Sequence, residues 1–252
     1  MKKKILATML LVVTVVNILA VAASADSAHA WFIKRRGNEQ PDFPPDAEMV
    51  KEHAGYYIGD SDEKVIYLTF DAGYENGNIE KILDTLKEES VPAAFFILDN
   101  LIIKNTDLIK RMQSEGHLVC NHTKNHHDLT KCSEEEIAKD LSSLNELCLE
   151  KTGHELSKYF RFPEGKYSES ALTCVEKLGY KTIFWSFAYD DWDNCRQPCA
   201  DAAMKKILQN THNGAVILLH PTSATNAKIL PELIKTWKSM GYTFGTLDDL
   251  TA

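Results

Sequence analysis

Two histidines, His122 and His126, stand four residues apart in the segment HTKNH, which follows the apolar run HLVC and Asn121. On a helical turn this spacing places both imidazoles on one side, within reach of one metal ion. Two histidines bind a divalent metal poorly, so a third protein ligand, usually a carboxylate, is expected. Because the spacing alone is common, it indicates a metal site only in company with other groups.

Two further titratable residues end apolar runs. Asp71 follows EKVIYLTF, and His220 follows GAVILL. A carboxylate that takes a proton from water and an imidazole that protonates a leaving group together make a hydrolase of amide or ester bonds. Taken singly, each residue has a plain alternative as a helix cap, a surface charge or a hydrogen-bonded histidine.

The elements that must position these residues are alternating strands and helices. From Val65 onward, β-branched and aromatic runs alternate with amphipathic stretches in about seven βα steps. This alternation predicts an α/β fold with a parallel sheet, either open or closed into a barrel. Ser133 and Glu136 form a capping-box pattern that predicts the start of a long helix.

Polar and aromatic residues follow the other strands in the same way. They are Asn121, His122, Arg161, Trp185, Ser186, Asp191 and Trp192. Because the C-terminal ends of parallel strands meet at one edge, we expect these residues to share one mouth with Asp71 and His220.

The first thirty residues have the pattern of an export signal. A positive segment, MKKK, precedes a long apolar run, and small-residue cleavage sites follow at residues 23–25 and 28–30. We therefore expect residues 1–30 to be a signal peptide and the remainder to act outside the cytoplasm. An uncleaved membrane anchor is the alternative, and only then would a membrane be a partner.

Residues 31–62 are polar and proline-bearing, so they are predicted to be a leader that wraps the domain rather than part of its core. Their start, WFIKRR, is a small basic patch that we expect to be solvated. The chain carries 28 basic and 36 acidic residues, a formal net charge of −8. This acidic balance disfavours DNA and anionic lipid, so no nucleic-acid partner is expected.

Six cysteines are compatible with disulfides in an exported protein. Cys195 and Cys199, in CRQPC, are the best local pair, whereas Cys120 and Cys174 lie in apolar patterns that predict buried thiols. No CxxC segment is present in the sequence, so a zinc ribbon is not expected.

Five short motifs, in order over residues 65–248, resemble those of the polysaccharide deacetylases, the NodB-homology domains of carbohydrate esterase family 4. TFDAG (69–73) resembles the family's TFDDG, HTKNH its H-[ST]-x-x-H, and RFPEG (161–165) its R-x-P-x-G. DW (191–192) resembles the D-x-x-D-W region, and ILLH (217–220) resembles L-x-L-H. Each motif is weak alone, but the ordered set is specific.

The resemblance implies a distorted (β/α)7-type barrel over residues 63–250 that removes acetyl groups from N-acetylated sugars with a divalent metal. Zn²⁺ is the first expectation, with Co²⁺, Mn²⁺ or Mg²⁺ as alternatives. By this resemblance, His122 and His126 bind the metal. Asp71 is the catalytic base, and Arg161 holds it charged and oriented.

The resemblance assigns the other half of the chemistry to His220, the general acid that protonates the leaving amine, with Asp191 tuning it. The backbone N–H of Glu164 contributes to an oxyanion hole. Trp185 and Trp192 wall the pocket.

Two positions depart from the family pattern. The family's third metal ligand is Ala72 here, which lowers the expected metal affinity, and the first aspartate of the fourth motif is Ala188. TFDAGYENGN, FWSFAYDDW and the WFIK leader further resemble the delta-lactam-biosynthetic deacetylases of spore formers, whose second aspartate is also replaced. That resemblance implies peptide-free N-acetylmuramic acid as substrate, a step toward the muramic-δ-lactam that marks spore cortex for lysis at germination. Lys124 and Lys166 are candidate cations for its lactyl group, with solvated lysines as the alternative.

Three other hypotheses stay open. The chain could deacetylate N-acetylglucosamine in peptidoglycan or chitin. It could be an inactive glycan-binding module, as Ala72 suggests, or a metal-free hydrolase that uses Asp71 and His220 alone. The expected partners are peptidoglycan glycan strands, and an accessory protein is left open.

Overall fold

The computed structural model of the chain describes residues 26–252. Residues 1–25 of the predicted signal peptide therefore lie outside the described residues. Its last residues are described, and His29–Ala30 forms strand β1, which pairs antiparallel with β9 (Lys166–Tyr167). Within residues 26–252, no helix combines the length and apolar character needed to cross a membrane.

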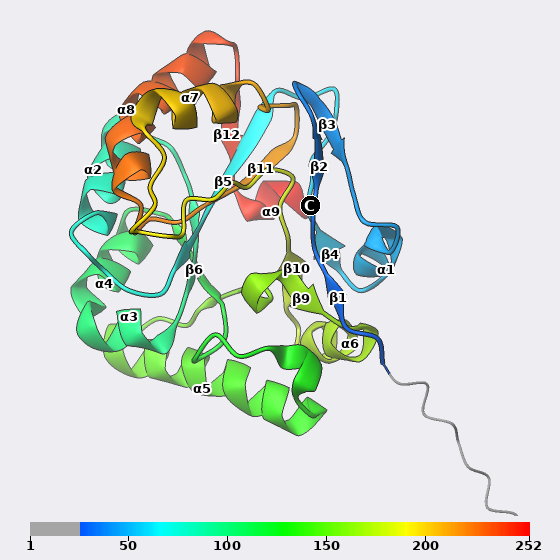
Figure 1. The fold of residues 1–252 in the computed structure, drawn as a ribbon. Helices are drawn as coiled ribbons and strands as arrows, with labels where there is room; N and C mark the ends of the chain where they lie inside the picture. Colours follow the sequence, from blue (N-terminus) through cyan, green and yellow to red (C-terminus); the bar gives the residue numbers. More distant parts are fainter. Residues whose placement is uncertain (1–25) are drawn as a thin grey trace, which may run out of the picture.

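A curled parallel sheet organises the domain (Figure 1). Its strands are β11 (Ala215–Leu219), β5 (Val65–Ala72), β6 (Ala94–Ile97), β7 (Leu118–Asn121), β8 (Ser157–Phe160), β10 (Lys181–Ile183) and β4 (Gly55–Tyr56), in that order. Strand β12 (Thr243–Gly245) pairs with the beginning of β5. Isolated bridges from Ile58 and Phe187 to β11 bring the two edges together, as the prediction of a distorted (β/α)7-type barrel requires.

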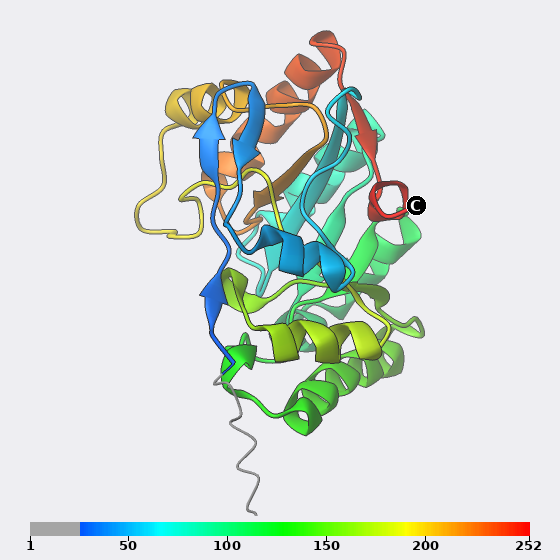
Figure 2. The ribbon, with the colours of Figure 1, turned by 90° about the vertical axis from the view of Figure 1, so that its right-hand side faces the viewer.

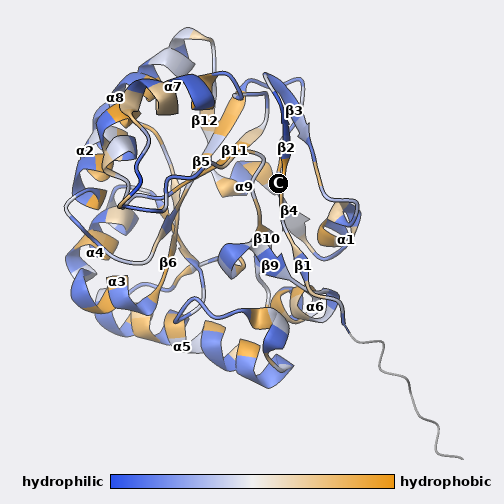
Figure 3. Cartoon of the chain, viewed as in Figure 1, coloured by the Kyte–Doolittle hydropathy of each residue, from blue (hydrophilic) through white to orange (hydrophobic). Residues whose placement is uncertain are grey.

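The strands form because their residues are β-branched or aromatic and are buried on both faces. β6 and β11 are buried at every position, and β5 is buried at six of its eight. Apolar colour accordingly runs along these central strands, whereas the surrounding helices alternate between apolar and polar residues (Figure 3).

Helices cover the outside of the sheet (Figure 1). They are α1 (Ala47–Glu52), α2 (Ile79–Glu89), α3 (Asp99–Lys104), α4 (Thr106–Ser114), α5 (Glu134–Thr152), α6 (Glu169–Lys177), α7 (Ala200–Leu208), α8 (Ala224–Ser239) and α9 (Leu247–Leu250). Two short 3-10 turns, η1 (Leu129–Lys131) and η2 (Pro163–Gly165), complete the chain. The predicted capping box at the start of α5 is confirmed, because Ser133 and Glu136 bond reciprocally.

The prediction that residues 31–62 lie outside the core is wrong. Strand β4 joins the sheet beside β10, and Trp31, Val50 and Tyr57 are buried in a cluster against β8 and α6. Residues 26–42, here called the N-terminal strap, include β1, β2 (Lys34–Arg36) and β3 (Glu39–Asp42). The strap runs along one side of the domain from the α6 end to the α7 end (Figure 2), where Asn38 donates to the carbonyl oxygens of Leu208 and Thr211.

All six cysteines are free thiols in the structure. The expected local pair, Cys195 and Cys199, is exposed and unbonded, so that prediction is wrong. Cys120 and Cys174 are buried thiols, as their apolar surroundings predicted.

Candidate active site

Asp71 and Arg161 form a buried ion pair. Asp71 is the seventh residue of β5, and Arg161 directly follows β8. Arg161 Nη1 lies 2.7 Å from Asp71 Oδ1, and the Arg161 side chain is 0% exposed. The rest of its guanidinium is also satisfied, because Nε donates to the carbonyl oxygen of Ile183 at 2.9 Å and Nη2 donates to Thr69 Oγ1 at 2.9 Å.

Burial alone would raise the pKa of Asp71. The positive charge of Arg161 outweighs that effect, with help from His122 and His220, and holds the pKa of Asp71 below its ordinary value. Asp71 is therefore a carboxylate at neutral pH, fixed in direction by one hydrogen-bonded partner.

His220 and Asp191 make the second pair. His220 directly follows β11, and its Nδ1 lies 2.7 Å from Asp191 Oδ1. Burial lowers the pKa of His220, but the hydrogen bond and charge of Asp191 raise it by more, so that the net shift is upward. Asn226 at the start of α8 supports the pair, because its Nδ2 donates to Asp191 Oδ2 at 2.6 Å.

His122 and His126 come together as predicted, with ring centroids 5.0 Å apart and an interplanar angle of 72°. The predicted helical turn is wrong: residues 122–126 form a loop, in which Thr123 and His126 adopt left-handed backbone with φ of 69° and 58°. The loop is held by side chains, since Asn121 Oδ1 accepts from the Thr123 N–H and Asp140 Oδ1 accepts from the Lys124 N–H.

His122 is oriented by Arg161. Its Nδ1 lies 2.8 Å from the Arg161 carbonyl oxygen, which can only accept, so Nδ1 carries the proton and Nε2 offers a lone pair. Nε2 lies 3.5 Å from Asp71 Oδ2. Burial lowers the pKa of His122 to about 4, which keeps the ring neutral at pH 7.

This chemistry suits a metal ligand, and the two imidazoles supply two nitrogen donors beside Asp71. The third donor is missing where the family pattern places it, because Ala72 has a methyl group and is 0% exposed. Among residues 26–252, no group of three or more His, Cys, Asp or Glu side chains is arranged to hold a metal ion. His122 and His126 therefore offer two nitrogen donors, fewer protein ligands than the family pattern has.

Most predicted site residues face one pocket of about 730 Å³. Its wall includes Asp71, His126, Glu164, Trp185, Trp192 and His220. His122, Arg161 and Asp191 stand behind that wall and act on the residues in it through the bonds described above. Asp71, His126 and His220 therefore meet in one pocket at the C-terminal ends of the strands.

The pocket's aromatic residues differ in how firmly they are held. The Trp185 carbonyl oxygen accepts from Trp31 Nε1 at 2.9 Å, and the Trp185 ring lies against Gly165. Trp192 is 59% exposed at the rim. Trp185 is thus a fixed part of the wall, whereas Trp192 offers an open apolar face to a ligand.

Neither lysine that the sequence suggested lines this pocket. Lys166 Nζ lies 2.6 Å from Glu164 Oε2 and is neutralised there, and Lys124 lines a separate surface hollow beside α3 and α5. The cation on the wall is Arg35, from β2 of the N-terminal strap. In the sequence, Arg35 belongs to the basic segment WFIKRR, which was expected to be solvated rather than to line a pocket. Asn226 carried no sequence signal that linked it to Asp191.

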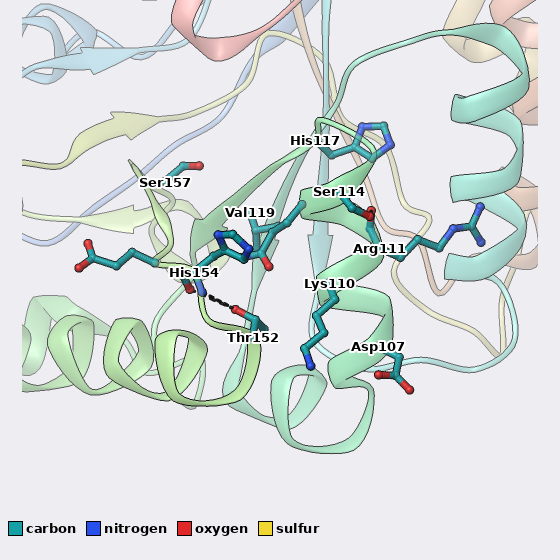
Figure 4. A pocket seen from close by; sticks show the side chains of 11 residues that line it. Asp107, Lys110, Arg111, Ser114, His117, Val119, Thr152, His154 and Ser157 are labelled. Carbon is teal, nitrogen blue, oxygen red and sulfur yellow. Dashed lines mark hydrogen bonds between the residues drawn. The ribbon is translucent and has the colours of Figure 1, made fainter.

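A second hollow, of about 790 Å³, lies at the opposite end of the sheet, where β7 and β8 begin. It contains Lys110, Arg111, His117 and His154 (Figure 4). The labelled charged side chains point in different directions and do not converge on one point. The pocket with Asp71 and His220 is therefore the candidate active site.

Comparisons with known proteins identify the family of the chain. The sequence model of the polysaccharide deacetylase family matches residues 58–183. Peptidoglycan-N-acetylmuramic acid deacetylase PdaA of Bacillus subtilis is 40% identical over 225 residues, which cover 87% of this chain and 84% of the relative. Peptidoglycan-N-acetylglucosamine deacetylase PgdA of Listeria monocytogenes is 34% identical over 187 residues, which cover 74% of this chain and 39% of the relative.

The solved structure of Bacillus subtilis PdaA, described as a family 4 carbohydrate esterase, superposes with a TM-score of 0.86 at 38% identity. The match covers 89% of this chain and 97% of that one. The family resemblance seen in the sequence motifs and the barrel fold are thereby confirmed. The chain belongs to the polysaccharide deacetylase family, the family 4 carbohydrate esterases.

Proposed function

We propose that this chain hydrolyses the N-acetyl group of N-acetylmuramic acid in peptidoglycan strands that have lost their stem peptides. The observation that carries the reaction is the pairing of Asp71 with Arg161 and of His220 with Asp191 at one pocket. The substrate is supported by the similarity to PdaA, whose name states N-acetylmuramic acid.

Asp71 is the base in this proposal. It takes a proton from a water molecule, whose oxygen then attacks the carbonyl carbon of the acetyl group. Arg161 keeps Asp71 ionised until that moment and fixes the direction of its free oxygen. The backbone N–H of Glu164, on the pocket wall, is the proposed donor to the oxygen that becomes negative.

His220 is the acid. When the carbon–nitrogen bond breaks, the sugar nitrogen takes the proton from His220, and acetate and a free amine are the products. Asp191 keeps His220 protonated and turns its other nitrogen toward the pocket. Trp185 and Trp192 flank the sugar and limit access of bulk water.

His122 and His126 are the proposed ligands of a divalent ion, Zn²⁺ first, which when bound polarises the attacking water and the acetyl carbonyl. Neutral imidazoles with a free nitrogen favour this role. We further propose that the chain is exported by residues 1–30 and acts on spore cortex, where its product leads to muramic-δ-lactam.

N-acetylglucosamine is the alternative substrate, favoured by the similarity to PgdA. An inactive glycan-binding module is disfavoured, because a binder has no need of an ion-paired carboxylate and an ion-paired histidine in one pocket. These hypotheses are separated by measuring acetate release from purified glycan strands, with and without stem peptides and with Zn²⁺ or a chelator. Release only from peptide-free muramic residues, and only with metal, is expected; release from glucosamine alone contradicts the proposed substrate.

A further inference from the structure

Arg35 brings a positive charge to the active-site pocket from a distant part of the chain. It lies in the middle of β2 and lines the same pocket as Asp71, Trp192 and His220. Successive side chains of a strand point to opposite faces. Its neighbour Arg36 accordingly lies in another hollow, on the outer side of the strap.

The guanidinium of Arg35 is held without being neutralised. Its Nη2 donates to the carbonyl oxygen of Ala188, and its centre lies 5.6 Å from the ring centroid of Phe187. No ion pair joins Arg35 to any carboxylate within residues 26–252, whereas Arg36 pairs with both Glu39 and Asp42.

Two of the acids on the pocket wall already have cationic partners. Asp71 is paired with Arg161, and Glu164 with Lys166. Asp190, the wall's remaining acid, makes no ion pair in the described part of the chain. Arg35 therefore has N–H donors to spare, and a planar guanidinium matches a carboxylate through two parallel hydrogen bonds.

We propose that Arg35 binds the lactyl carboxylate of N-acetylmuramic acid and so selects muramic residues that lack a stem peptide. The inference rests on the proposed function and names the residue that sets its substrate. The lactyl ether and the acetamido group occupy neighbouring carbons of one sugar ring. A residue that binds the lactyl carboxylate must therefore line the same pocket as the base and the acid. A stem peptide converts the carboxylate into an amide, which removes the charge, and N-acetylglucosamine has no such group.

The test compares two substrates that differ only at this group: a glycan fragment with the free lactyl carboxylate, and the same fragment with a carboxamide. Arg35→Gln should lower kcat/KM for the acid by about 10- to 100-fold, mainly through KM, because a hydrogen-bonded charge pair is lost. The value for the amide should be unchanged, and Arg35→Lys should restore part of the preference. Arg36→Gln is the matched control and should leave both values unaltered.

Equal losses on acid and amide in Arg35→Gln, or no preference for the acid in the unaltered chain, would overturn the inference. Calorimetric binding of both fragments to the Asp71→Asn chain, with and without Arg35→Gln, separates the two proposals. Arg35-dependent binding of the acid without acetate release by the unaltered chain contradicts the reaction alone. Acetate release with binding that is indifferent to Arg35 contradicts the role of Arg35 alone.

Discussion

The carboxylate of Asp191 accepts two hydrogen bonds from His220, one from Nδ1 at 2.7 Å and one from the backbone N–H at 2.8 Å. The two bonds fix the ring relative to its own backbone. The bond at Nδ1 and the negative charge of Asp191 also favour the protonated ring, so the pKa of His220 lies above its ordinary value.

Activity should therefore persist above the ordinary histidine pKa and fall as pH rises through the raised pKa of His220. Asp191→Asn removes the negative charge and should move this alkaline limb to lower pH. The pH profile of kcat/KM measures the shift, since it reports the essential groups of the free enzyme. Asn226→Ala removes a hydrogen-bond donor to Asp191 but keeps its charge, so it should move the limb less. An alkaline limb that stays in place in Asp191→Asn contradicts the assignment of His220 as the acid.

The ion pair of Asp71 and Arg161 should also make the free energy of unfolding depend on pH. Because the pKa of Asp71 is lower in the folded chain than in the unfolded one, its contribution to stability is full above the unfolded pKa. It is lost as pH falls through the folded pKa. Arg161→Met leaves an unpaired carboxylate at the same place and should cost about 3–5 kcal/mol of unfolding free energy.

Urea denaturation at neutral and acidic pH measures this prediction. The cost of Arg161→Met should shrink as pH falls, because a protonated Asp71 no longer needs a partner. Arg36→Met is the exposed control and should cost less than about 1 kcal/mol. A cost of Arg161→Met that is independent of pH would mean that lost packing, rather than charge, explains it.

The convergence of Asp71, Arg161 and His220 was predictable because each ends or follows a strand of a parallel sheet, and such ends share one edge. The ordered motifs added the roles. The conformation of residues 122–126 was not predictable, because left-handed backbone at Thr123 and His126 depends on Asn121 and on a carboxylate from α5. A four-residue spacing shows that two side chains can meet, but not by which backbone path.

The N-terminal strap was missed for a related reason. Its large apolar residues, Trp31 to Ile33, form one run of three, which is too short to show a helical or strand period. The burial of Trp31 arises from aromatic partners far along the chain, with Phe184 stacked at 4.6 Å between ring centroids. Trp31 on one side of Arg35 and Asn38 on the other hold the strap against the domain, and these long-range contacts leave no local sequence pattern.

Metal affinity should depend on residue 72. Ala72→Asp restores the carboxylate of the family pattern next to Asp71 in the sequence and should tighten Zn²⁺ binding by at least about tenfold. This follows because even outer-shell partners are worth 10- to 100-fold. Calorimetric titration of Zn²⁺ into Ala72→Asp, the unaltered chain and His126→Ala should rank the three in that order. Equal affinity of the first two would show that a carboxylate at this buried position does not reach the ion.

Gly165 sets the position of Trp185 and gives a test of the pocket wall. Its φ is +67°, and a Cβ added there would lie 2.8 Å from Cη2 of the Trp185 ring. Gly165→Ala should therefore cost about 1–3 kcal/mol through backbone strain and should push the indole toward the pocket. Gly116, which has φ of +86° with open space around it, is the matched control for strain without contact.

Both alanine variants should lose stability in thermal unfolding, but only Gly165→Ala should also raise KM. An unchanged KM in Gly165→Ala would show that the ring of Trp185 does not touch the bound sugar.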